Sequence, residues 1–210
     1  NLIKLIVIFT ALEGFPAEGS RHASLSSLLF LLPFLLFSGW AGLLADRHSK
    51  RSVMISMKVL EVAVMGLAFF FLAGRNLPGL YLVLFLMGIH STFFGPSKYG
   101  ILPEILPDKE LSRANGYLEM TTFMAIVLGT SLGGFLFARW YDQPHLLGAV
   151  LLGIALVGLV TSRGIPRVPT AKGPLAPSLN PFKGLWAAYQ DLRSRKPLWL
   201  TVLGLSYFWF

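Results

Sequence analysis

Long apolar runs separated by short connections are the feature that most restricts how this chain can fold. An α-helix needs about 20 apolar residues to cross a hydrocarbon core of roughly 30 Å, and several of the runs have that length. Only 13% of the 210 residues are charged, whereas an ordinary globular chain carries about 25%. Because a soluble fold could not cover so much apolar surface, the sequence predicts an all-α membrane protein.

Six of the runs define predicted spans. They cover residues 1–12, 25–45, 52–73, 79 to about 96, 114–138 and 146–163, and the first is shorter than a full span. A further run, 198–210, stays apolar to its last residue and predicts the start of a seventh span. We therefore expect a six-helix bundle over 1–163 with a truncated first helix, a linker over 164–197, and a truncated seventh helix.

Basic residues are distributed unevenly over the connections. Of the 18 Lys and Arg residues, 13 lie in the connections after the second, fourth and sixth spans: Arg47, Lys50, Arg51, Lys98, Lys109, Arg113, Arg163, Arg167, Lys172, Lys183, Arg193, Arg195 and Lys196. The positive-inside rule places these connections, the N-terminus and the 164–197 linker in the cytoplasm. This topology explains the net charge of +8, so no nucleic-acid partner is predicted.

The linker divides into two parts. Four prolines between residues 164 and 180 exclude a helix there. Asn180 followed by Pro181 is typical of a helix start, and we expect a helix over about 181–196. Its apolar residues fall within a single arc: Phe182, Leu185, Trp186, Tyr189 and Leu192. The pattern fits a helix lying on the cytoplasmic membrane face and, equally, a helix packed on its own bundle.

The connection between the second and third spans has a recognisable pattern. It reads Gly42-Leu43-Leu44-Ala45-Asp46-Arg47-His48-Ser49-Lys50-Arg51. In a tight turn Asp46 can cap a helix end or pair with a base, while the basic residues hold the cytoplasmic face. The pattern resembles the signature loop of the major facilitator superfamily, with Ser49 where that family usually has glycine. The alternative is an ordinary positive-inside loop with an incidental aspartate.

A second pattern extends over the end of the fourth span and the fifth. The two stretches read Gly95-Pro96-Ser97-Lys98-Tyr99-Gly100-Ile101-Leu102-Pro103-Glu104 and Leu111-Ser112-Arg113-Ala114-Asn115-Gly116-Tyr117-Leu118-Glu119. Together they resemble the lysophospholipid transporter branch of that superfamily, including members fused to an acyltransferase and an acyl carrier protein ligase. The sequence Asn1-Leu2-Ile3-Lys4 is also similar to the first helix of the branch.

This resemblance implies a fold, a substrate and a set of site residues. The fold is the N-terminal six-helix half of a secondary transporter in a bacterial inner membrane, partnered by a missing C-terminal half. The implied substrate is a lysophospholipid, with phosphoethanolamine as the expected head group. It is moved inward for reacylation by an acyltransferase and acyl carrier protein ligase, fused or separate. The implied substrate-binding residues are Asn1, Lys58, Glu61, Lys98, Tyr99, Asn115 and Glu119. The implied gating loop comprises Gly42, Asp46, Arg47, Lys50 and Arg51.

Polar residues inside the spans support such a site on physical grounds, because a charge at mid-membrane costs roughly 2.5–3.5 kcal/mol by insertion scales. Lys58 and Glu61 lie three apart on one helical face, with Met54, Met57 and Met65 on the same arc. One interpretation is a structural ion pair. The other is a cavity wall in which the charges meet a zwitterionic head group and the methionines meet an acyl chain.

The fifth span carries a polar and small-residue stripe. Asn115, Glu119, Thr122, Ile126, Gly129, Thr130 and Gly133 fall within about 100° at helical pitch. Gly129 and Gly133 predict close packing by another helix. Glu119 has no basic residue one turn away and predicts a position facing a cavity. Lys98 and Tyr99 fit either a phosphate contact or an interfacial anchor.

Other activities find little support in the sequence. The four histidines lack metal-ligand spacing, and no phosphate-binding lysine loop or serine nucleophile motif is present, so no metal, cofactor or catalytic residue is predicted. Two alternatives to lysophospholipid transport remain. One is a general exporter of drugs or metabolites with the same fold, and the other is the membrane part of a fused acyltransferase–ligase.

Overall fold

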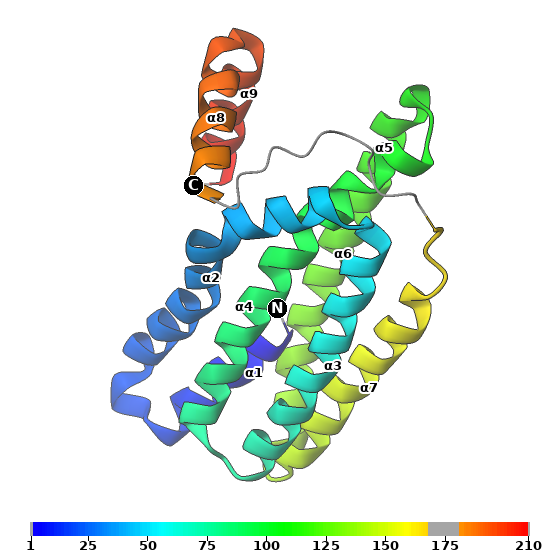
Figure 1. Ribbon diagram of the computed structural model, residues 1–210. Helices are drawn as coiled ribbons and strands as arrows, with labels where there is room; N and C mark the ends of the chain where they lie inside the picture. Colours follow the sequence, from blue (N-terminus) through cyan, green and yellow to red (C-terminus); the bar gives the residue numbers. More distant parts are fainter. Residues whose placement is uncertain (1, 168–180, 210) are drawn as a thin grey trace. The chain divides into compact units, whose positions relative to one another are not determined.

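A computed structural model describes residues 2–167 and 181–209 (Figure 1). Asn1 and the proline-rich segment 168–180 therefore lie outside the described residues. The chain forms two compact units, one within residues 1–172 and the other within 173–210. The regular elements of the described part are helices.

The first unit contains the predicted bundle. Its elements are α1 (Leu2–Gly14), a 3-10 turn (Pro16–Glu18), α2 (Gly19–Arg47), α3 (Lys50–Ala73), α4 (Leu77–Gly100), α5 (Leu102–Ile105), α6 (Asp108–Trp140) and α7 (Pro144–Ser162). By length and composition, α2, α3, α4 with α5, α6 and α7 can each cross a membrane. At 13 residues, α1 is shorter than a span, as expected of the first apolar run.

Several helices extend beyond the predicted spans. The fourth was expected to end near Pro96, but α4 includes Pro96 and continues to Gly100, so Lys98 and Tyr99 occupy its last turn. The fifth was expected from Ala114, but α6 begins at Asp108. Hydropathy measures only the stretch that fits the hydrocarbon, whereas the helix continues wherever its ends are stabilised. In α6 the acidic side chains of the first turn complement the helix dipole.

The core of this unit is formed by α1, α3, α4 and α7. Its fully or nearly fully buried side chains include Ile6, Val64, Leu72, Leu84 and Leu147. Two glycines bring helix backbones together. A Cβ on Gly88 of α4 would lie 2.5 Å from the Phe30 carbonyl oxygen of α2, and one on Gly148 of α7 would lie 2.6 Å from Cα of Phe69 in α3. Larger side chains would force these helix pairs apart.

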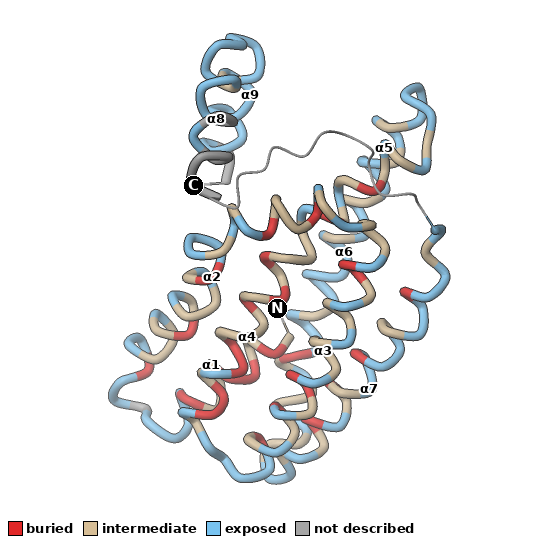
Figure 2. The backbone as a smooth tube through the Cα atoms, viewed as in Figure 1, coloured by how far each residue is buried: buried red, intermediate tan, exposed pale blue. Residues whose placement is uncertain are grey.

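In contrast to these four helices, α6 is exposed along most of its length (Figure 2). Gly133 is its only buried residue. Large apolar side chains such as Phe123, Val127 and Phe135 are 44%, 62% and 66% exposed. In an aqueous protein such a surface would be unstable, so this helix requires lipid or another apolar surface against it.

The second unit consists of α8 (Pro181–Ser194) and α9 (Lys196–Trp209). Within α8 the rings of Trp186 and Tyr189 stack with their centroids 5.5 Å apart. Tyr189 also meets Trp199 of α9 edge to face, at 5.9 Å. The helix predicted over about 181–196 thus ends at Ser194, because the next helix begins at Lys196 with Pro197 in its first turn, where proline is well tolerated.

Candidate functional site

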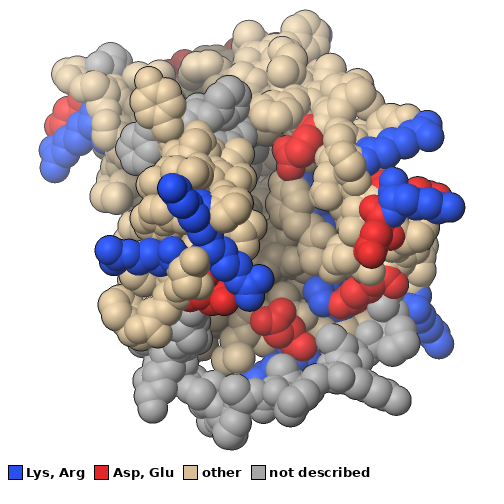
Figure 3. All heavy atoms as spheres, turned by 90° about the horizontal axis from the view of Figure 1, so that it is seen from above, with Lys and Arg blue, Asp and Glu red and all other residues tan. Residues whose placement is uncertain are grey.

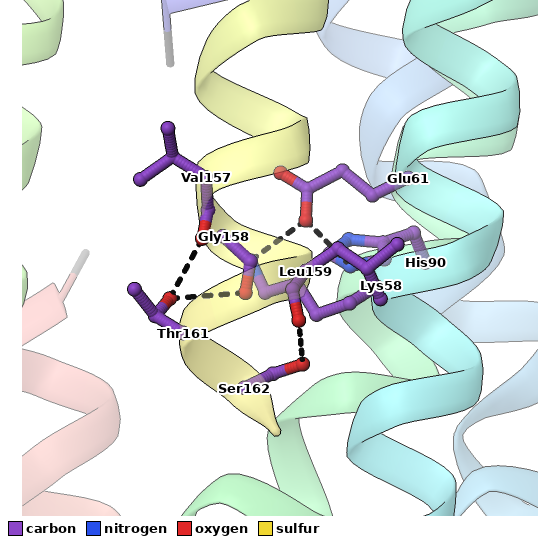
Figure 4. A network of polar contacts seen from close by, with 8 residues as sticks. All are labelled: Lys58, Glu61, His90, Val157, Gly158, Leu159, Thr161 and Ser162. Carbon is purple, nitrogen blue, oxygen red and sulfur yellow. Dashed lines mark hydrogen bonds and ion pairs between the residues drawn. The ribbon is translucent and has the colours of Figure 1, made fainter. Parts of the chain in front are cut away.

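Three titratable side chains meet inside the bundle, and we call Lys58, Glu61 and His90 the buried triad (Figure 4). The Lys58 Nζ lies 2.7 Å from Oε2 of Glu61, one turn further along α3. The same oxygen lies 3.5 Å from Nε2 of His90, which α4 supplies. The side chain of His90 is only 8% exposed, and those of Lys58 and Glu61 are 22% and 17% exposed. The Lys58 ammonium and the His90 imidazole therefore approach the same oxygen of the Glu61 carboxylate.

Residues of the neighbouring helices α4 and α7 enclose the buried triad. Lys58 Nζ lies 5.2 Å from the centre of the Phe94 ring on α4. On α7, a Cβ at Gly158 would lie 3.4 Å from the same nitrogen, so α7 passes directly beside the ammonium. Met54 and Met65 are buried, and Met65 belongs to the bundle core. The interpretation of this face as the wall of a lipid cavity is therefore wrong for these two methionines, because helix packing covers them.

A second group of polar side chains lies between the last turn of α4 and the first half of α6, and we call it the α4–α6 cluster. Lys98 donates a hydrogen bond from Nζ to Oγ1 of Thr122, at 2.7 Å. The same ammonium lies 5.1 Å from the centre of the Tyr99 ring. The Glu119 carboxylate interacts with the Tyr99 hydroxyl. The cluster thus places a cation, a carboxylate and a phenol at the junction of two helices.

Two members of the α4–α6 cluster, Lys98 and Thr122, line a groove along α6. One cavity of about 350 Å³ is lined by Lys98, Thr121, Thr122, Ala125 and Ile126. A second, also of about 350 Å³, is lined by Lys4, Leu5, Ile8, Ala23, Ser27, Ile126 and Thr130. Ile126 belongs to both cavities, so we treat them as one feature, the α6 groove. Its floor is apolar, with a lysine in each of its two parts.

The predicted stripe on α6 divides into two parts in the structure. Thr122, Ile126 and Thr130 line the α6 groove. Gly129 and Gly133 pack against α1, where a Cβ on Gly133 would lie 3.4 Å from Cδ2 of Leu5. The remaining member, Asn115, is exposed one turn before Glu119. The helix therefore presents polar side chains and a close-packing surface side by side.

The predicted gating loop is a short turn, His48–Ser49, between α2 and α3. Asp46 lies exposed in the last turn of α2, and among the described residues it neither caps a helix nor pairs with a base. The side chain is exposed because α2 continues to Arg47, so the expected cap or ion pair stays a prediction. Gly42 has open space where a Cβ would stand, so packing within this unit does not require glycine there.

The basic residues of the same turn bind other parts of the bundle. Lys50 forms an ion pair with Glu104 of α5. Arg51 donates from Nε to the Ile165 carbonyl, at 2.7 Å, and from Nη2 to the Arg163 carbonyl, at 3.2 Å. These carbonyls follow the end of α7, where a cation is favoured by the helix dipole. From the end where α2 meets α3, basic and acidic side chains are seen interspersed (Figure 3).

Sequence reasoning missed three of these participants. His90 was considered only as a metal ligand, and Lys4 and Glu104 only as parts of a span or motif. A signal existed for the first two, since a titratable residue in an apolar run normally faces a partner or a cavity. No comparable signal marked Glu104, because its contact with Lys50 joins residues 54 positions apart.

The helices define a multi-pass membrane protein, and the α6 groove suits an amphiphile, since an apolar floor is combined with charged groups. The sequence profile of the Major Facilitator Superfamily matches residues 7–210. The chain therefore belongs to the Major Facilitator Superfamily, a family of membrane transporters, in agreement with the resemblance of the α2–α3 turn.

Curated relatives of this chain carry a more specific name. It is 31% identical over 185 residues to the lysophospholipid transporter LplT of Klebsiella pneumoniae subsp. pneumoniae, covering 87% of this chain and 44% of that protein. It is 31% identical over 194 residues to LplT of Enterobacter sp. (strain 638), with the same coverage. For LplT of Yersinia pestis (strain Pestoides F) the identity is 30% over 189 residues, covering 87% and 43%. The chain thus spans less than half the length of these relatives.

Proposed function

We propose that the full-length protein is a secondary transporter that moves lysophospholipid across the bacterial inner membrane, with its N-terminus and the 164–197 linker in the cytoplasm. Two findings support this proposal. Relatives about 30% identical over 87% of the chain are named lysophospholipid transporters. The α6 groove combines an apolar floor with charged and polar groups, as a one-chain lipid with a zwitterionic head group requires.

In this proposal the α4–α6 cluster holds the head group. Lys98 binds its phosphate, and Glu119 binds the ammonium of a phosphoethanolamine group, while Ile126 and the apolar floor contact the acyl chain. Lys98 already donates to Thr122, so its ammonium is held at the edge of the α6 groove before the lipid arrives. A positioned cation loses less conformational freedom on binding than a mobile one.

Transport then requires a second six-helix half that rocks against this one around a shared cavity. The exposed apolar surface of α6 is available for lipid or for that half. The α2–α3 turn serves as the gating element, with Asp46 exposed for a partner outside the described residues. The lipid delivered inward is reacylated by an acyltransferase and acyl carrier protein ligase, whether fused or separate.

The test is lysophospholipid uptake by the full-length protein in proteoliposomes, normalised to the protein inserted. A hydrogen-bonded charge contact is worth about 1.5–3 kcal/mol, or roughly ten- to a hundred-fold in affinity. We therefore expect Lys98→Ala and Glu119→Ala each to reduce normalised uptake at least tenfold. Lys98→Arg should retain more activity, because a cation still reaches the phosphate.

The structural alternative predicts a different result. If Lys98 and Glu119 only join α4 to α6, the alanine variants will lose protein from the membrane and normalised uptake will remain unchanged. That outcome would remove both residues from the substrate site. Thr161→Val is the matched control, since Thr161 of α7 is exposed, lines neither part of the α6 groove, and bonds through its hydroxyl to carbonyls of its own helix.

A further inference from the structure

A further cavity, which we call the distal pocket, is lined by residues at the end of the bundle opposite the α2–α3 turn. Figure 1 shows the helix ends and turns that lie there. The end of α1, the turn between α3 and α4, the end of α6 and the start of α7 all contribute to it. The residues that matter here are Glu13, Arg75, Phe137, Tyr141 and Leu147. Its volume is about 190 Å³, smaller than the pockets of roughly 300–1,000 Å³ that hold drug-sized ligands.

The backbone of Arg75 is the first unusual feature of the distal pocket. Its φ of 48° lies in the left-handed region, and it is the only described residue other than glycine with a positive φ. A side chain costs roughly 1–2 kcal/mol in this conformation, which glycine adopts freely. Here the conformation ends α3 in a common helix C-terminal turn, in which the Arg75 N–H donates to the Leu72 carbonyl and the Asn76 N–H to the Phe71 carbonyl. Arginine occupies the position where glycine is usual, and the turn directs its side chain to the pocket.

The Arg75 guanidinium is held over Tyr141. Its Nη2 donates to the Tyr141 carbonyl at 3.3 Å, and its central carbon lies 5.3 Å from the centre of the tyrosine ring. These contacts use part of the guanidinium, which has five N–H donors in a planar fork that suits phosphate. A phosphate can therefore be bound without breaking the contacts that position the group.

A carboxylate completes the polar rim. Glu13 lines the pocket with Tyr141, and interaction with the Glu13 carboxylate raises the pKa of the Tyr141 hydroxyl. Glu13 and Arg75 thus interact with the same tyrosine, which places an anion and a cation at one small opening. Phe137 and the buried Leu147 give the pocket an apolar base.

We propose that the distal pocket binds a phosphoryl–amine zwitterion, with Arg75 on the phosphate and Glu13 on the ammonium, and that it captures the head group of the lipid from the leaflet opposite the α2–α3 turn. The capture step rests on the proposed transport function. The pocket admits a head group and leaves the acyl chain outside, because its volume is about half that of either cavity of the α6 groove.

The first experiment measures equilibrium binding of glycerophosphoethanolamine and of glycerol 3-phosphate to the full-length protein in nanodiscs. Arg75→Gly removes the guanidinium and suits the left-handed backbone, so the variant should fold at least as well as the wild type. We expect it to weaken binding of both probes at least tenfold. Glu13→Gln should weaken only glycerophosphoethanolamine, because glycerol 3-phosphate has no ammonium.

Arg21→Ala is the matched control for the loss of a positive charge at this end of the bundle. Arg21 is exposed at the start of α2 and pairs with Glu18 at 2.9 Å. It does not line the distal pocket. Unchanged binding in both Arg75→Gly and Glu13→Gln, or an equal loss in Arg21→Ala, would overturn the proposal. A fall in melting temperature in Arg75→Gly with binding retained would assign Arg75 a purely structural role.

Uptake of lysophosphatidylethanolamine separates this site from the proposed function. We expect Arg75→Gly to raise KM at least tenfold with little change in kcat, because capture precedes the transport step. Wild-type binding of the probe without any lipid uptake would remove the transport function and leave the site. Lipid uptake without probe binding would support the transport function and reject the distal pocket as a binding site. Equal affinity for glycerophosphoethanolamine and the lysolipid would identify a free zwitterion, rather than a lipid, as the ligand.

Discussion

The buried triad and the α4–α6 cluster contain similar residue types but satisfy them differently. Each has a lysine and a glutamate on helices that the structure shows to be long and apolar enough to span a membrane. In the triad, Lys58 and Glu61 bind each other directly, and His90 approaches the same carboxylate. In the cluster, Lys98 binds a neutral hydroxyl and Glu119 interacts with a neutral phenol.

This difference separates a structural network from a binding site. The charges of Lys58 and Glu61 cancel within one turn of α3, which lowers the cost of placing them in the membrane. Lys98 and Glu119 are held by neutral partners, so each retains its charge for a further ligand. A zwitterionic ligand supplies a negative charge for Lys98 and a positive charge for Glu119. The pairing state of a charge, more than its depth in a span, indicates its role.

The largest effect should follow from removing the carboxylate of the triad. Glu61→Leu leaves Lys58 uncompensated beside His90, and breaking a buried ion pair in this way typically costs about 3–5 kcal/mol. We expect membrane abundance and melting temperature to fall sharply. Glu119→Leu should leave both nearly unchanged, because no charge depends on it. Fluorescence-detected size-exclusion chromatography measures the abundance and melting temperature of both variants. Equal losses of stability in the two would contradict the distinction between the triad and the cluster.

A smaller effect is expected when both charges of the triad are removed. Replacing a buried ion pair by apolar residues of similar size is often neutral. We expect Lys58→Met/Glu61→Leu to recover most of the stability lost in Glu61→Leu and to retain lysophospholipid uptake per inserted molecule. A stable double variant without uptake would show that the triad takes part in transport, contrary to the structural interpretation.

The smallest effect concerns the hydroxyl that positions Lys98. Thr122→Val removes the hydroxyl that positions the Lys98 ammonium, but the cation itself remains to bind the phosphate. We expect normalised uptake to fall threefold to tenfold, less than in Lys98→Ala, with abundance unchanged. Measured beside Thr161→Val, a loss in the control as large as in Thr122→Val would show that the effect is not specific to Lys98.

The elements of the fold were predictable because their causes are local. A run of about 20 apolar residues specifies a spanning helix wherever it occurs, and α2, α3, α4, α6 and α7 all follow from such runs. The pairing of Lys58 with Glu61 was also readable, since residues three apart share one face of a helix. Helix ends were less predictable, because capping and not hydropathy decides them.

The contacts between helices could not be obtained from the sequence alone. Periodicity gives the angular position of a side chain on its own helix but not the neighbour it meets. His90 reaches Glu61 because α3 and α4 pack together, and Lys98 meets Thr122 across 24 residues. Arg51 binds the end of α7, 112 to 114 residues away. The sequence by itself determined which segments are helical and which polar residues lie within them. Tertiary packing decided which of those charges are compensated. The reason is that crossing geometry and close approaches such as those at Gly88 and Gly148 depend on two helices at once.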